Sequence, residues 1–370
     1  MNSKQSLFIL LAVMIGLLLS SGCVSYLQAH LPPAAYPEIR PVQGATLLTN
    51  PEYTFDFADF QVSISSPVDP DVYSGARSAE KEVRIYDNSI SDDEWRSGFY
   101  RTMTTDPAQD PFFEDLASEF REIRSGYNLD SDEYLELMGV FVQSLPYKNQ
   151  NLSSPKYPIE TYIDGEGDCD DKSMLLAGLL AHEGYGVALL YFGPEKHMAV
   201  GVACPGEGYR NTGYAYLETT RVSLVGNEAG SLVGNITLTS EPLVIPIGDG
   251  TVRYMRCNET RAIYAELIHL REQLESLGTD LRDREDALET KKSDLVAMEG
   301  VIEQIRNNGD ISGYNRMVSE YNKKVRDYNQ NLDQYNEISG EYARLAERHN
   351  YIISHEHDRA GIYLTLSGTV

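Results

Sequence analysis

The chain of 370 residues has few cysteines, few tryptophans and a shortage of basic side chains. It contains four cysteines and one tryptophan, and 31 lysines and arginines stand against 56 aspartates and glutamates, for a net charge of −25. So acidic a chain repels nucleic acid and anionic membrane surfaces. The sequence also lacks a Cys-x-x-Cys pair and a glycine-rich phosphate loop, so we expect no metal, no cofactor and no nucleic-acid partner.

Long apolar runs are also scarce, and the longest lies at the N-terminus. Lys4 precedes the run Leu7–Leu19, which has the length of a signal-peptide core and is short for a membrane span. Small residues then precede Cys23, as at the processing site of prokaryotic lipoproteins. We therefore predict a signal peptide over residues 1–23, with Cys23 as the lipidation candidate and a protein anchored on the outer face of the membrane. Plain secretion and an uncleaved N-terminal anchor are the alternatives.

The rest of the chain divides by composition. The proline-containing stretch 24–43 is typical of a linker, and 44–109 is interpreted as a β-containing N-terminal region because Phe60–Ile64 and Lys81–Tyr86 have strand-like patterns. From residue 110 to 258 the sequence predicts helices followed by strands, hence an α+β domain. The first two helices are expected near Phe112–Arg124 and Asp132–Ser144.

Cys169 stands where one of the helices of this domain should begin. A turn rich in glycine and acids precedes it, and the apolar run Met174–Leu180 follows. Unpaired amides and the positive dipole end at a helix N-terminus favour an anion. A cysteine there can have its pKa lowered from about 8.5 to between about 3.5 and 7.5, although Asp170 and Asp171 oppose this by like-charge repulsion. We expect a reactive Cys169, with an inert buried thiol as the alternative.

A general base and a group to orient it follow on neighbouring strands. The apolar segment Val187–Phe192 predicts a strand, and after a short turn His197 begins a second strand that runs to Ala203. A third strand ends with Glu218. Cysteine, histidine and carboxylate in this order form the thiol version of a nucleophile, base and orienter.

At these residues the chain resembles the transglutaminase-like superfamily, and within it the microbial predicted cysteine peptidases. The resemblance covers about residues 110–225 and rests on four segments: Tyr157–Thr161, Gly165–Ser173, His197–Val202 and Tyr216–Thr220. It implies a papain-like core with Cys169 as nucleophile, His197 as base and Glu218 as orienter, where the family more often has aspartate. It also makes Gln143 a candidate donor to an oxyanion hole, beside the Cys169 backbone amide.

The other two cysteines of the exported part are Cys204 and Cys257. In an oxidising exterior they could pair as a disulfide and leave Cys169 free. Two unrelated buried thiols are the alternative.

Residues 259–350 have a sustained heptad pattern. The second half repeats tyrosine followed by asparagine every seven residues, and Asn307-Asn308-Gly309 interrupts the pattern between the halves. This predicts a left-handed coiled coil folded into an antiparallel hairpin, whose half-polar tyrosine seam leaves self-association through the coil open. Residues 351–370 are expected to include a returning strand at Gly361–Leu366.

Two functions remain open from the sequence, beside a third, purely structural role as a coiled-coil surface protein. The first is a surface-tethered thiol enzyme that cleaves amide bonds in a protein or peptide substrate, with hydrolysis favoured over crosslinking. The second is a cell-surface binding module in which the papain-like core has no activity and the coiled coil is a scaffold.

Overall fold

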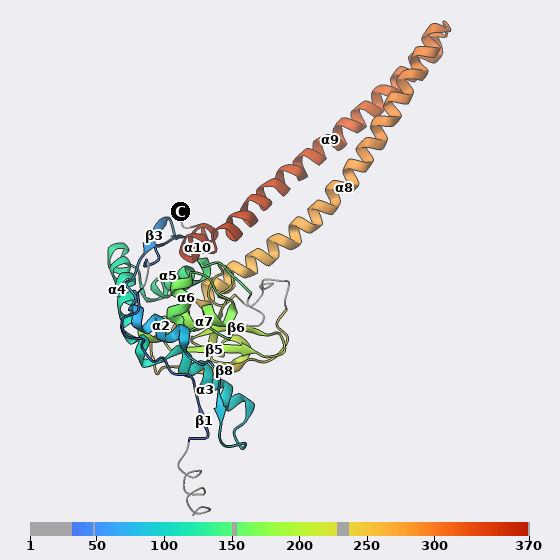
Figure 1. Cartoon of the computed structure of the whole chain (residues 1–370). Helices are drawn as coiled ribbons and strands as arrows, with labels where there is room; N and C mark the ends of the chain where they lie inside the picture. Colours follow the sequence, from blue (N-terminus) through green and yellow to red (C-terminus); the bar gives the residue numbers. More distant parts are fainter. Residues whose placement is uncertain (1–31, 47–48, 150–153, 228–236, 369–370) are drawn as a thin grey trace, which may run out of the picture. The chain divides into compact units, whose positions relative to one another are not determined.

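The computed structural model describes residues 32–46, 49–149, 154–227 and 237–368 (Figure 1). The chain forms two compact units, one up to Cys257 and one from Asn258. The first mixes helices with a small sheet and the second is helical, so the expected α+β class and the long helical C-terminal region are confirmed.

The main sheet of the first unit is antiparallel, in the order β7-β6-β5-β8. Its strands are β5 (Val187–Phe192), β6 (His197–Ala203), β7 (Tyr214–Leu217) and β8 (Leu243–Ile247). The central strands β5 and β6 are almost entirely buried, which explains why they are continuous apolar runs rather than alternating ones. They pair from Phe192–His197 to Val187–Val202, so His197 lies at the edge where the turn joins them.

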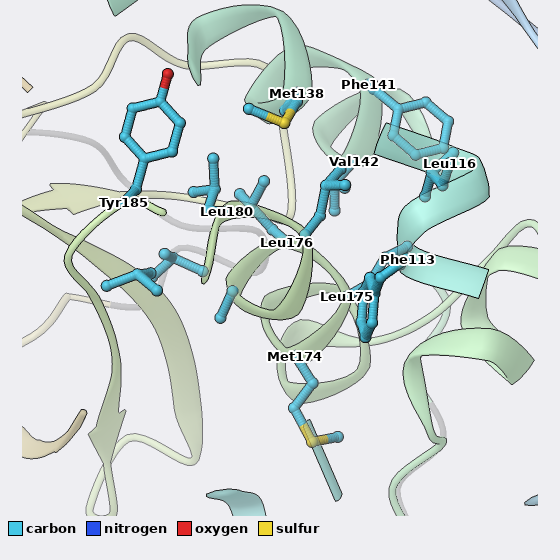
Figure 2. Packing of buried hydrophobic residues seen from close by; sticks show 14 of the residues in the cluster. Phe113, Leu116, Met138, Phe141, Val142, Met174, Leu175, Leu176, Leu180 and Tyr185 are labelled. Atoms are coloured by element: carbon cyan, nitrogen blue, oxygen red, sulfur yellow. The ribbon is translucent and has the colours of Figure 1, made fainter. Parts of the chain in front are cut away.

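Helix α7 (Cys169–His182) lies at the centre of this unit. Its residues Asp171–Leu180 are all buried, and the part from Met174 to Leu180 is apolar around its whole circumference, as expected of a core helix. Figure 2 shows its leucines packed against side chains of two neighbouring helices, α4 (Asp110–Tyr127) and α5 (Ser131–Ser144). A Cβ at Gly178 would lie 2.3 Å from the Phe113 ring, so this glycine allows α4 to approach α7 closely.

The helix ends are set by local sequence. Asp130 and Glu133 form a capping box at the start of α5, and Asp168 and Asp171 form one at the start of α7. Helix α4 is capped at its C-terminal end by Asn128. The backbone of Asn128 is left-handed, a conformation that asparagine tolerates well. The expected helices near 112–124 and 132–144 are therefore present, with slightly wider bounds.

The N-terminal region contains more helix than the sequence predicted. Its elements are β1 (Ala34–Ala35), β2 (Tyr53–Phe57), β3 (Phe60–Ile64), α2 (Pro70–Ser78), β4 (Arg84–Ile85), α3 (Asp92–Thr104) and η1 (Pro107–Gln109). The strand expected at Lys81–Tyr86 shrinks to β4, which pairs with β1. The β2–β3 hairpin packs on α5, with the rings of Tyr53 and Phe141 5.6 Å apart.

Part of the expected linker is also packed on this unit. Ile39 is buried, and its backbone amide donates a 2.8 Å hydrogen bond to Asp106. Residues 32–43 are therefore not a free tether, because apolar burial and a buried hydrogen bond hold them. The signal peptide, Cys23 and the rest of the linker lie outside the described residues.

The second unit is a long helical hairpin of α8 (Cys257–Asn307) and α9 (Ile311–Ser354) (Figure 1). Cross-helix contacts join Arg284 to Gln334 at 3.2 Å and Lys291 to Asp327 at 2.5 Å. Moving forward on one helix moves backward on the other, so the helices are antiparallel, as the heptad pattern predicted. Leu288 is buried in the seam between them.

The returning strand expected at Gly361–Leu366 is wrong. This segment is helix α10 (Arg359–Ser367), which begins where the Asp358 side chain accepts the Gly361 amide. An ion pair between Arg359 and Glu259 and the buried side chain of Ile362 hold α10 within the second unit. These contacts and the cap favour a helix over an edge strand.

Candidate functional site

The site is built around Cys169, the first residue of α7, with Asp168 as the helix cap. The Cys169 Sγ lies 3.9 Å from the Lys196 carbonyl oxygen, and the backbone amide of Met198 hydrogen-bonds the sulfur. Because Lys196 and Met198 flank His197 in the chain, the helix start and the start of β6 meet at this thiol.

His197 is paired with Glu218, and both side chains are buried. The His197 Nε2 lies 3.2 Å from Glu218 Oε2 and also 3.2 Å from the Tyr216 hydroxyl. The structure therefore brings together the base and the orienting carboxylate that the sequence predicted, from β6 and from the residue after β7.

Glu218 accepts hydrogen bonds on both carboxylate oxygens. Oε2 accepts from His197 and from the Tyr216 hydroxyl at 2.6 Å, and Oε1 accepts from the Thr219 and Thr220 amides and the Thr220 hydroxyl. Burial alone would raise the pKa of this carboxyl, but the His197 partner and the hydroxyl donors lower it to about 2. Glu218 is thus ionised at neutral pH.

The ionised carboxylate fixes the tautomer that His197 needs. An ionised carboxylate only accepts hydrogen bonds, so Nε2 of a neutral imidazole must carry the proton. Nδ1 is then the unprotonated nitrogen, available to take a proton. A histidine–acid pair in this arrangement is suited to a general base.

The thiol differs from the expected thiolate. Burial, followed by the charges of Asp170 and Asp168, raises the pKa of Cys169 well above its usual range. Burial of the sulfur is the larger cause that outweighs the favourable end of the helix, and the acidic cap of α7 adds to it. Cys169 is therefore a neutral thiol in this conformation, and the balance that the sequence left open between the helix end and the acids falls against a lowered pKa.

The acids beside Cys169 are held by one another and by the helix end. Asp170 accepts a hydrogen bond from the Tyr100 hydroxyl at 3.3 Å, and burial and neighbouring Asp168 raise its pKa well above the usual range. Carboxylate oxygens of Asp168, Asp170 and Asp171 lie within 4.8 Å of one another, a spacing that could hold a cation. The capping of α7 already explains the positions of the Asp168 and Asp171 side chains. Asp171 also accepts a 2.7 Å hydrogen bond from the Lys156 amide.

Gln143 does not take the place expected for an oxyanion donor. Its side-chain amide donates to the carbonyl oxygens of Glu218 at 2.7 Å and Ser223 at 2.9 Å, so both of its hydrogens are used. Its oxygen accepts from the Ser223 amide. Gln143 instead fixes the backbone at Glu218 and at Ser223.

Three side chains of the site were missed in the sequence. Tyr216 lies two residues before Glu218, and the alternation of a strand puts both on one face, a signal that could have found it. Lys172 is buried and donates to the carbonyls of Gln143 at 3.3 Å and Leu145 at 2.7 Å, and burial lowers its pKa to about 7. Ser173 contacts the segments that follow His197 and Glu218.

The disulfide expected between Cys204 and Cys257 is not formed, and the structure holds both residues as thiols. The Cys204 sulfur is directed instead at the Gly213 carbonyl oxygen, 3.9 Å away. Across the described ranges, no helix is long and apolar enough to cross a membrane.

Compared with known protein families, with curated proteins and with solved structures, the chain gives no match. The transglutaminase-like resemblance and the papain-like core therefore stay predictions that rest on the residues above.

Proposed function

We propose that this chain is a thiol enzyme that cleaves amide bonds through a covalent acyl-enzyme on Cys169. The observation that carries the proposal is the buried His197–Glu218 pair, which meets Cys169 through the two residues that flank His197. A nucleophile, a base and an orienter from three elements are the parts that such chemistry requires.

The proposed reaction starts from the neutral thiol. Sγ forms a bond to the carbonyl carbon of the substrate while its proton passes to Nδ1 of His197, and Glu218 stabilises the imidazolium that results. The Cys169 backbone amide, which has no helical acceptor at the first turn, can donate to the oxyanion. The C–N bond then breaks, the leaving amine takes the proton from His197, and water hydrolyses the thioester.

Acyl-enzyme formation gives a direct test. The chain is incubated with a nitrophenyl ester, and the acyl group is counted by intact mass and located by peptide mapping. We expect one acyl group on Cys169, none there in Cys169→Ala, and a rate at least about 100-fold slower in His197→Ala.

A matched control is available on the same helix. His182 pairs with Glu114 at 2.8 Å, but it lies at the other end of α7 from Cys169. His182→Ala should leave the acylation rate unchanged. Equal rates in the parent, His182→Ala and His197→Ala would overturn the proposed function.

The substrate and location in this proposal follow from the sequence. A protein or peptide amide is the substrate, water is the acceptor, and the enzyme acts outside the cell, tethered through the segment that ends at Cys23. Release of a free carboxylate rather than an isopeptide product, in the presence of an added primary amine, would support hydrolysis over crosslinking.

A non-catalytic binding module is the second candidate, and the thiol favours it. Burial and the neighbouring aspartates keep Cys169 protonated, as in an inert structural cysteine. This candidate predicts acylation no faster than that of Cys204 and no effect of His197→Ala.

A further inference from the structure

Ser173 contacts both chain segments that carry the base and the acid. It is fully buried, and its hydroxyl lies 3.2 Å from the Met198 carbonyl oxygen and 3.0 Å from the Thr219 hydroxyl. Met198 follows His197, and Thr219 follows Glu218. A single side chain therefore touches the residue next to each member of the pair.

The strand pairing shows where such a contact can act. The ladder between β6 and β7 runs from Ala203–Tyr214 to Val200–Leu217. His197 and Glu218 lie beyond the last of these pairs, so ladder hydrogen bonds do not set their separation. Besides the direct bond between the two side chains and the Tyr216 hydroxyl, contacts from outside the sheet can hold the two segments together at this point.

Ser173 is also placed to relate this pair to the thiol. It follows Cys169 by four residues on α7, so the two side chains lie on the same face of the helix, one turn apart. Gln143 fixes the Glu218 carbonyl to α5, whereas Ser173 links the segment after Glu218 to the strand of His197 and both of them to the helix of Cys169.

We propose that Ser173 is a positioning residue, whose hydroxyl holds His197 and Glu218 at hydrogen-bonding distance and aligned with Cys169. Its effect on catalysis rests on the proposed function, but its effect on the pair does not. The hydroxyl donates to the Met198 carbonyl and accepts from Thr219, so both of its hydrogen-bonding roles are used.

The first test reads the histidine directly by NMR of the 15N-labelled full chain. The Nε2–H signal of His197, identified by its loss in His197→Ala, should shift or broaden in Ser173→Ala because the ring leaves Glu218. Thr219→Val, which keeps the side-chain shape and removes only the partner hydroxyl, should have the same effect. Ser173→Thr, which keeps the hydroxyl, should restore the parental signal.

Ser66→Ala is the matched control, because Ser66 is another fully buried serine, whose hydroxyl has no hydrogen-bond partner among the described residues. A parental Nε2–H signal in both Ser173→Ala and Thr219→Val would overturn the proposal. Thr219→Val keeps the test decisive should Ser173→Ala fail to fold.

The acylation rate gives the second reading. Misplacement by about 1 Å can slow a reaction about 100-fold, so Ser173→Ala should slow acylation of Cys169 by about 10- to 100-fold. In the Ser173→Ala background, His197→Ala should then slow acylation by a much smaller factor than it does in the parent chain. If His197→Ala slowed acylation as much in the Ser173→Ala background as in the parent, the positioning role would be overturned. If His197→Ala had no effect on acylation in the parent, the proposed function would be overturned, and the NMR result alone would decide the role of Ser173.

Discussion

At the scale of single residues, Glu218 is a buried carboxylate that accepts hydrogen bonds from several donors, and such a group is costly to protonate. Its pKa of about 2 lies below the 4.5 of an ordinary glutamate. A lowered folded-state pKa means that the stabilisation is complete above about 4.5 and is lost as the pH falls toward 2.

We therefore expect the stability difference between the parent and Glu218→Gln to shrink by about 2–3 kcal/mol between pH 5 and pH 2. Urea unfolding at several pH values measures it. Glu122→Gln, at an exposed position, serves as control and should show no such change. A pH-independent difference for Glu218→Gln would contradict the ionised buried carboxylate.

Lys172 should give a pH dependence of the opposite sense. Burial lowers its pKa to about 7 from the 10.5 of an exposed lysine, so between these values the unfolded chain binds a proton that the folded chain does not. Stability then rises with pH across this window.

Relative to Lys172→Met, the parent should gain on the order of 1–3 kcal/mol in free energy of unfolding from pH 7 to pH 9. Chemical denaturation at the two pH values tests this. A gain of the same size in Lys172→Met would show that another group is responsible.

At the scale of residues, the sequence placed the three candidate residues better than the side chains that hold them. Cys169, His197 and Glu218 could be placed because local patterns put each at the end of an element. Gln143 could not, because the direction of its amide depends on how α5 meets the end of β7. Ser173 stood within the conspicuous motif, but its two partners lie on segments that only tertiary packing brings together.

At the scale of elements, the cap of α7 and the state of the thiol are coupled. Asp168 begins the helix and also raises the pKa of Cys169 by its charge. Asparagine caps a helix about as well as aspartate but carries no charge, whereas alanine provides neither a cap nor a charge.

Asp168→Asn should therefore leave thermal stability nearly unchanged and move alkylation of Cys169 to lower pH. Asp168→Ala should move alkylation the same way and also cost about 1 kcal/mol. Iodoacetamide labelling against pH, read by mass spectrometry, and thermal melts distinguish them. An unchanged labelling profile in both variants would contradict the role given to the Asp168 charge.

The elements themselves were predictable where a hydrophobic pattern repeats over many residues, or where turn residues flank an apolar run on both sides. The tyrosines at seven-residue spacing fixed α9, and the apolar runs fixed α7, β5 and β6. Helix α10 was missed because a short apolar run such as Ile362–Leu364 fits a strand as well as a helix. Its start depends on Asp358, and the ion pair with Glu259 is distant in sequence.

At the scale of the whole molecule, the chain divides into a mixed unit and a helical unit near the place where the heptad pattern begins. The expected change at 258–259 compares with the observed division after Cys257. A heptad repeat marks such a division because it specifies packing between two helices without a globular core. What composition did not indicate is that residues 32–109 fold with the mixed unit, since that depends on contacts such as Tyr53 with Phe141.

Two compact units should unfold separately, and Leu288 and Leu176 allow this to be tested. Leu288 is buried in the hairpin and Leu176 in the core of the mixed unit, and loss of a buried leucine to alanine costs about 2–5 kcal/mol. Calorimetry should resolve two unfolding transitions. Leu288→Ala should lower the midpoint temperature of the hairpin transition, and Leu176→Ala should lower that of the mixed unit. Acylation of Cys169 should survive the first change unaltered, because every residue of the site lies in the mixed unit. If either substitution lowered both transitions together, the chain would unfold as one cooperative whole, and the hairpin would contribute to the stability of the site.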